Sequence, residues 1–108
     1  MAKKPIWISF DLGVRGDYEG IYQFLDGHAA KECGDSLAFL HFEFKNDLFA
    51  DLKKDLKGSV KTDKRTRIYV IFPEENGRHK GRFLVGGRKR PPWTGYATSD
   101  QTEEDVGE

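Results

Sequence analysis

Stretches with an apolar residue at every second position alternate along this chain with stretches of helical spacing. From Ile6 to Leu12 every second residue is apolar, which is the period of a β-strand with one buried face. From Tyr18 to Leu25 the apolar residues instead recur at helical spacing, after Asp17 as a candidate N-cap. A strand and a helix that each have one apolar face must bury those faces against each other. The chain therefore begins as a strand followed by a covering helix.

The same alternation continues through the rest of the apolar sequence. A second helix is predicted after Asn46 or Asp47, with Gly58 as its natural stop. Period two returns in three segments, of which the last two flank an Asn-Gly hairpin signal: Ser36–Phe44, Arg67–Phe72 and Lys80–Val85. The first of these segments forms either one long strand or two short strands that bend near His41.

This order of elements predicts an α+β fold. It reads strand, helix, strand, an optional extra strand, helix, strand, strand. Single helices between strands favour an open sheet of four to five strands with both helices on one face, in a ferredoxin-like arrangement. We expect one such domain over residues 1–96, because 108 residues suffice for one core and not for two.

The charges are unevenly distributed although the formal net charge of the chain is zero. Residues 100–108 carry five of the 18 acidic residues and none of the 18 basic ones, so the preceding chain is basic. Residues 97–108 also lack aromatic residues and periodicity, and we expect them to form a disordered acidic tail. The tail either increases solubility or folds back on a basic surface as a mimic of nucleic acid.

Composition and missing motifs exclude several classes of protein. Cys33 is the single cysteine, which rules out an intrachain disulfide and a cysteine-based zinc site and is typical of a reducing cytosol. No apolar run approaches the roughly 20 residues of a membrane span, and the first residues do not form a signal peptide. The sequence contains no HExxH motif, no Walker glycine loop and no serine nucleophile elbow. We therefore expect a cytoplasmic protein with no membrane partner and without a complete catalytic motif.

The segment ISFDLGVRGDYEGIYQFLDGHAAKECGDSLAFLHF resembles the start of a known group of proteins. These are the small ferredoxin-fold proteins related to the VapD toxins and to the CRISPR adaptation nuclease-like subunit. The resemblance rests on a first strand that ends in Phe10-Asp11-Leu12, a helix that opens with Asp17-Tyr18-Glu19, and a second strand entered at Asp35-Ser36. With the second helix and the strand RIYVIF, it covers roughly residues 5–73. The chain departs from the family in its β stretch between the helices and in its Gly- and Arg-rich C-terminal hairpin.

Asp11 is the candidate catalytic and metal-binding residue. In the family that this chain resembles, the aspartate that ends the first strand can bind a divalent metal, usually across a dimer interface, and Asp11 has that position. A carboxylate there could hold Mg²⁺ if further oxygen ligands approached, because hard cations need several. The alternative is that Asp11 accepts hydrogen bonds from the loop that follows the strand.

A basic segment near the C-terminal end of the domain is the clearest functional feature. Basic residues fall within a short stretch that contains no acid and leads to an aromatic residue: Arg78, Lys80, Arg82, Arg88, Lys89, Arg90 and then Trp93. Basic side chains neutralise phosphates, and exposed aromatic rings stack on bases. The alternative is an edge strand that charge protects from aggregation.

These features lead to two hypotheses about function. The first is a small nucleic-acid-associated protein, acting on RNA or DNA, with or without metal-dependent endonuclease activity at Asp11. The second is a non-enzymatic protein-interaction module, an inhibitor or adaptor that uses the same basic residues on an acidic protein surface. We also expect a homodimer, because the predicted sheet has exposed edges and two-fold pairing is the commonest assembly.

Overall fold

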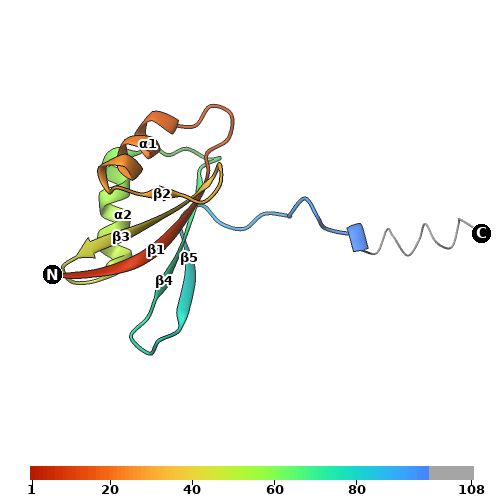
Figure 1. Ribbon diagram of the computed structural model, residues 1–108. Helices are drawn as coiled ribbons and strands as arrows, with labels where there is room; N and C mark the ends of the chain where they lie inside the picture. The colour runs from red at the N-terminus through yellow and green to blue at the C-terminus, as the bar shows by residue number, and fades with distance from the viewer. Residues whose placement is uncertain (98–108) are drawn as a thin grey trace, which may run out of the picture.

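The computed structural model describes residues 1–97 as two helices packed on one side of a five-stranded antiparallel sheet (Figure 1). The elements in chain order are β1 (Ala2–Asp11), α1 (Tyr18–Gly27), β2 (Lys31–Glu32), β3 (Leu37–Phe44), α2 (Leu48–Ser59), β4 (Arg67–Pro73) and β5 (His79–Val85). The strands lie in the order β2-β3-β1-β4-β5. The predicted α+β fold, a ferredoxin-like open sheet with one additional edge strand, is confirmed.

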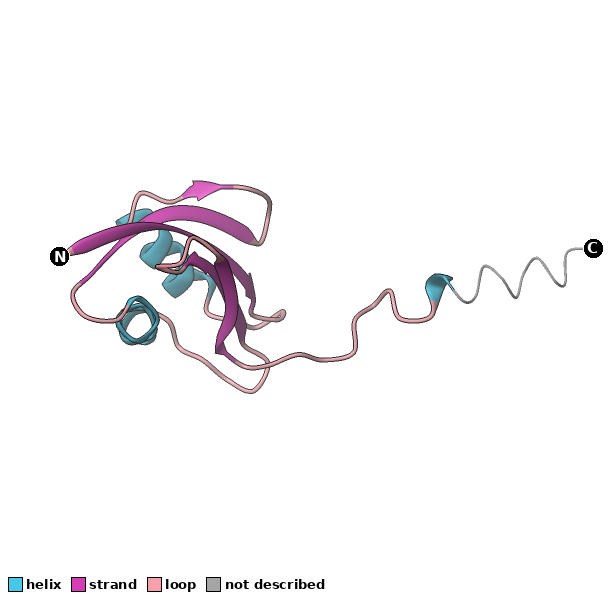
Figure 2. Cartoon of the chain, turned by 90° about the horizontal axis from the view of Figure 1, so that it is seen from below, coloured by secondary structure: helices cyan, strands magenta, loops and turns pink. Residues whose placement is uncertain are grey.

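Both helices begin where the sequence places an aspartate. The side chain of Asp17 accepts a hydrogen bond from the backbone N–H of Gly20, and Asp47 does the same for Ala50. Each carboxylate satisfies a backbone donor that the first helical turn leaves without a partner. The apolar stripes of the two helices then meet the sheet, as Figure 2 shows from a second direction.

The core lies between the helices and one face of the sheet. The inward-facing residues of β1, such as Ile6 and Ile8, are completely buried, as are Leu52 and Leu56 of α2. A bulge at Ile68–Tyr69 shifts the register of β4 against β5, so that consecutive residues near the end of β5 contact the core. Alternation along each strand leaves the opposite face of the sheet without a covering helix in residues 1–97.

The segment between the helices resolves an alternative that the sequence left open. The predicted segment Ser36–Phe44 forms one strand, β3, over Leu37–Phe44, and it does not split at His41. The additional strand is the two-residue β2, Lys31–Glu32, in a stretch for which the sequence predicts no strand. Such a short strand has no readable period, because two residues cannot show an alternation.

Helix α1 ends at Gly27, whereas the end of α2 differs from the stop predicted at Gly58. Helix α2 passes Gly58 and ends at Ser59, where the cap residue Val60 is extended and its N–H donates to the carbonyl of Leu56. Val60 is buried in the core, so packing holds the final turn beyond the glycine.

Within residues 1–97, no helix combines the length and the apolar character needed to cross a bilayer. The acidic tail predicted for residues 97–108 lies, from residue 98 onward, outside the described residues.

Candidate functional site

Asp11 lies at the end of β1, directly opposite the first residue of β4. The register pairs Asp11 with Arg67, and the guanidinium of Arg67 donates a hydrogen bond of 2.7 Å to Asp11 Oδ2. This bond is the main cause that holds the pKa of Asp11 below its ordinary value. The carboxylate is therefore ionised near neutral pH and already has a cationic partner.

The surroundings of Asp11 do not fit a divalent metal. A Mg²⁺ ion takes six oxygen ligands at near-octahedral positions. Residues 1–97 contain no group of three or more His, Cys, Asp or Glu side chains placed to hold a metal ion. The groups nearest the carboxylate are cationic, with Arg67 bonded to it and Lys89 also lowering its pKa. A single chain presents one carboxylate among positively charged side chains, and these charges disfavour the binding of a divalent metal ion.

The hollow beside Asp11 is instead suited to an anion. It has a volume of about 340 Å³ and lies where β1 ends, β4 begins and the chain leaves β5. Its lining includes four basic residues, namely Lys64, Arg65, Arg67 and Lys89. Gly13, Gly86 and Gly87 form the backbone part of the lining, so few side chains obstruct access to it. We call this site the basic hollow.

The loop before β4 is held in place by its own side chains. Asp63 Oδ1 accepts a 2.8 Å hydrogen bond from the backbone N–H of Arg65, and Thr66 Oγ1 accepts one of 2.9 Å from the N–H of Asp63. Thr66 is 2% exposed. This compact turn fixes the positions from which Lys64 and Arg65 reach the basic hollow.

A second hollow continues from the first along the segment after β5. It has a volume of about 290 Å³ and shares Arg67 and Lys89 with the basic hollow. The sequence-predicted residues Arg88, Arg90 and Trp93 also line it. Four of the residues proposed from sequence as a nucleic-acid surface therefore come together: Arg88, Lys89, Arg90 and Trp93.

The other predicted basic residues lie elsewhere. Arg82 is on the helix side of β5, where its guanidinium lies 3.8 Å from the ring centroid of Phe49 in α2. Lys80 is on the same side, 4.0 Å from a carboxylate oxygen of Glu74. Arg78 belongs to the turn between β4 and β5. The six basic residues thus do not share one face. Lys80 and Arg82 lie on the helix side of β5, whereas Arg88, Lys89 and Arg90 follow the end of that strand.

Aromatic side chains gather on the open face of the sheet. Trp7 of β1 and Phe39 of β3 lie opposite each other with ring centroids 5.0 Å apart, and Tyr69 of β4 and Phe83 of β5 form a second pair at 4.8 Å. All four are partly exposed. Arg88 joins this set, since its guanidinium lies 5.7 Å from the Tyr69 ring and 5.8 Å from the Phe83 ring.

Six residues of this region were not predicted from the sequence as site residues, namely the aromatic residues Trp7, Phe39 and Tyr69 and the basic residues Lys64, Arg65 and Arg67. The available signal was the alternation within the strands, which puts these aromatic residues on the face opposite the core. What was missing was the pairing of β4 with β1, since the Asn-Gly signal predicts only the pairing of β4 with β5. We call the four rings Trp7, Phe39, Tyr69 and Phe83 the aromatic platform.

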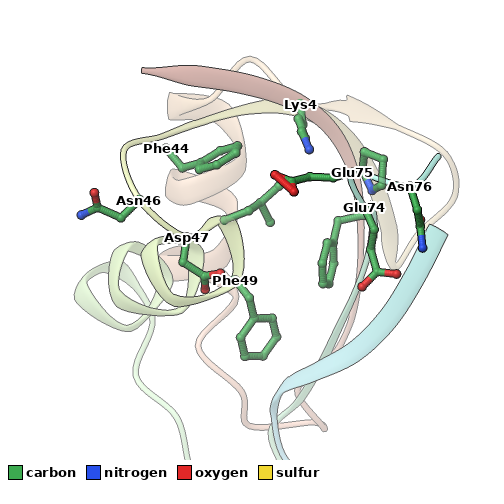
Figure 3. Close-up of a pocket in the computed structure, with 11 residues that line it drawn as sticks. Lys4, Phe44, Asn46, Asp47, Phe49, Glu74, Glu75 and Asn76 are labelled. Atoms are coloured by element: carbon green, nitrogen blue, oxygen red, sulfur yellow. The ribbon is translucent and has the colours of Figure 1, made fainter. Parts of the chain in front are cut away.

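The far end of the sheet carries a hollow of the opposite charge. Figure 3 shows this pocket of about 550 Å³, which the rings of Phe44 and Phe49 border. Its charged lining consists of Lys4 and three carboxylates, those of Asp47, Glu74 and Glu75. Asp47 is occupied as the cap of α2. Lys4 and Asp11 lie near opposite ends of β1, so negative and positive hollows are separated along the strand.

No protein-family profile, no curated protein and no solved structure matches this chain.

Proposed function

We propose that this protein binds nucleic acid, and that the basic hollow and Arg88–Arg90 hold its phosphates. The observation that carries the proposal is that Lys64, Arg65, Arg67 and Lys89 converge on one hollow beside Asp11. Four cations and one carboxylate leave a positive site, and basic side chains bind the phosphate backbone by releasing its counterions. Arg67 is partly neutralised by Asp11, which leaves the other three as the main phosphate ligands.

The shape of the site supports a polymer rather than a single anion. The basic hollow and the hollow lined by Arg88, Arg90 and Trp93 share two residues, so they form one continuous surface. A continuous basic surface can contact successive phosphates, whereas a lone anion needs only one such hollow. Trp93 is 72% exposed beside this surface and is free to contact a base.

The test measures how salt and charge affect binding of a labelled oligonucleotide. The Lys64→Ala/Lys89→Ala variant is expected to bind at least about tenfold more weakly in low salt, and with a smaller salt slope, because two phosphate contacts are lost. The matched control is Lys54→Ala/Lys57→Ala, which removes the same charge from exposed positions on α2. Fluorescence anisotropy at several salt concentrations gives both quantities.

Three outcomes would contradict the proposal. Absence of binding to RNA and DNA at low salt would reject it, and so would equal weakening by the two double variants. Cleavage of the oligonucleotide in Mg²⁺ that Asp11→Asn abolishes would replace simple binding with the endonuclease activity that the family resemblance implies.

A second candidate, separate from the inhibitor or adaptor hypothesis, is self-association of the chain as a homodimer. The outer edge of β3 supports it, because β2 pairs only with Ala38 and Phe39. Residues 40–44 of β3 have no partner strand on that side in the described part of the chain. An unpaired edge is a template for another strand. A monomer mass in sedimentation equilibrium at high protein concentration would exclude this assembly.

A further inference from the structure

We infer that the nucleic acid is single-stranded and that its bases stack on the aromatic platform of the open sheet face. This inference rests on the proposed function, since the phosphates would be held in the basic hollow. It adds the substrate class, which the basic residues alone do not determine. Basic side chains contact the backbone of a duplex and of a single strand alike.

The rings of the aromatic platform are partly exposed and lie on the sheet face opposite the hydrophobic core. Trp7, Phe39, Tyr69 and Phe83 project from the sheet face that no helix covers within residues 1–97. Ile71 lies opposite Trp7 on the neighbouring strand and is 39% exposed, so the surface between the two ring pairs is also apolar and accessible. Covering an exposed apolar ring with another flat apolar group removes ring surface from water and lowers the free energy.

Gly81 widens the platform on its β5 side. It lies opposite Ile71, and a Cβ atom built at this position would overlap the ring of Tyr69. The absent side chain therefore lets the Tyr69 ring lean across β5 toward the sheet edge. The platform then extends over four adjacent strands, from Phe39 of β3 across β1 and β4 to Phe83 of β5.

The charges around the platform are complementary to a phosphate backbone. Lys3 and Lys31 lie on the β3 side, at positions opposite Glu43 and Phe39, and Arg67 and Arg88 lie on the β4–β5 side. The acidic residues of this face, Glu43 and Asp11, each lie opposite a basic residue. Basic side chains therefore border the rings on both sides. When the nucleobases of a nucleic-acid strand lie on the rings, its phosphates would contact these basic side chains.

The basic hollow and the aromatic platform are close enough for one nucleic-acid strand to contact both. Arg67 lines the hollow, and Tyr69 is two residues further along β4, a separation of about 7 Å. Phosphates in the hollow would thus place neighbouring bases over Tyr69 and Phe83. In a duplex, the flat surfaces of the bases are buried in the stack, so only an unpaired strand can use the rings.

The test monitors Trp7 while the protein binds. The chain contains two tryptophans, so Trp93→Phe leaves Trp7 as the single emitter. The probes are a ten-nucleotide oligouridylate, the matching oligothymidylate and a duplex of the same length. We expect both single strands to quench Trp7 emission and to bind at least about tenfold more tightly than the duplex, because stacking is available only to them.

Matched variants separate the rings from general apolar packing. Tyr69→Leu and Phe39→Leu retain an apolar side chain but remove the ring, and each is expected to weaken single-strand binding by about tenfold or more. Tyr22→Leu is the control, because Tyr22 is 54% exposed on α1, on the other side of the sheet. Thermal melting shows whether each variant is folded. The quenching of Trp7 emission is measured without these three substitutions, so it tests the inference even if a variant does not fold.

The outcomes distinguish this inference from the function on which it rests. Salt-dependent binding that is equal for duplex and single strand, with unchanged Trp7 emission, would overturn the inference and leave the proposed function standing. Equal weakening by Tyr22→Leu and Tyr69→Leu would also overturn it. Absence of any binding at low salt would remove both.

Discussion

At the scale of single residues, Asp17 connects two parts of the chain that are distant in sequence. Its Oδ1 accepts a 3.0 Å hydrogen bond from the N–H of Gly20, and its Oδ2 accepts one of 2.8 Å from the N–H of Lys61. The carboxylate thus caps α1 and fixes the chain that follows α2. These two backbone hydrogen bonds, that of Lys61 first, lower the pKa of Asp17 below its ordinary value of 3.8.

The lowered pKa of Asp17 predicts a pH-dependent contribution to stability. A carboxyl whose pKa is lower in the folded state stabilises that state above the unfolded pKa, and the effect disappears as pH falls through the folded pKa. Asp17→Ala should lower Tm by several degrees near pH 7. The difference from the wild type should shrink below pH 3.8. Circular dichroism melts at several pH values measure it, and a constant difference down to about pH 2 would contradict the carboxylate's role.

Gly86 predicts a second effect at the residue scale. Its φ of 76° lies in the left-handed region, and a Cβ atom there would lie 2.5 Å from the backbone oxygen of Thr66. Gly86→Ala should therefore destabilise the fold by about 1–3 kcal/mol in urea denaturation. Gly87→Ala is the matched control, because a Cβ at Gly87 meets no atom within 4 Å. Its change should stay within about 0.5 kcal/mol, and equal losses for both variants would disprove the steric explanation.

At the scale of elements, β5 is an edge strand with charge on one side. It pairs only with β4, and Lys80 and Arg82 project toward the helices rather than into the basic hollow. These two residues support the alternative reading of the basic hairpin, in which charge keeps the sheet edge from pairing with other chains. Arg88–Arg90 follow the strand and line the hollow at its end.

This division of the basic residues predicts how β5 responds to substitution. Lys80→Val/Arg82→Val should increase concentration-dependent self-association, because it removes two charges and raises the β-propensity of an edge strand. The binding of nucleic acid should change little, since neither residue lines the basic hollow. Light scattering and sedimentation velocity measure the association, with Lys54→Val/Lys57→Val on α2 as the control. A double variant that remains as soluble and monodisperse as its control would refute protection of the edge by charge.

At the scale of the whole molecule, negative and positive charge lie at opposite ends of the sheet, and the aromatic platform lies between them. The acidic pocket near Lys4 and the basic hollow near Asp11 lie toward opposite ends of β1. An anionic polymer approaching the protein is therefore attracted to one end and repelled from the other. The platform lies on the sheet face between these ends, which no helix covers within residues 1–97.

Short-range patterns in the sequence are enough to predict the local structure and the class of fold. Alternation within strands, helical spacing and the aspartate caps are short-range patterns, and each fixes an element through the burial of one face or one unsatisfied donor. The prediction of the α+β sheet with two helices on one face followed from them. The two-residue β2 and the passage of α2 beyond Gly58 did not follow, because contacts with β3 and the burial of Val60 stabilise them.

The assembly of the candidate site depends on contacts between distant parts of the chain. Asp11, the adjacent pair Lys64-Arg65, and Lys89 come from three distant parts of the sequence, and they meet because β4 lies between β1 and β5. The same pairing separated Lys80 and Arg82 from Arg88 and brought Arg67 to the carboxylate of Asp11. The alternation showed which face each residue takes. It contained no information on which strands are neighbours, because strand order depends on long-range packing of the helices against the sheet.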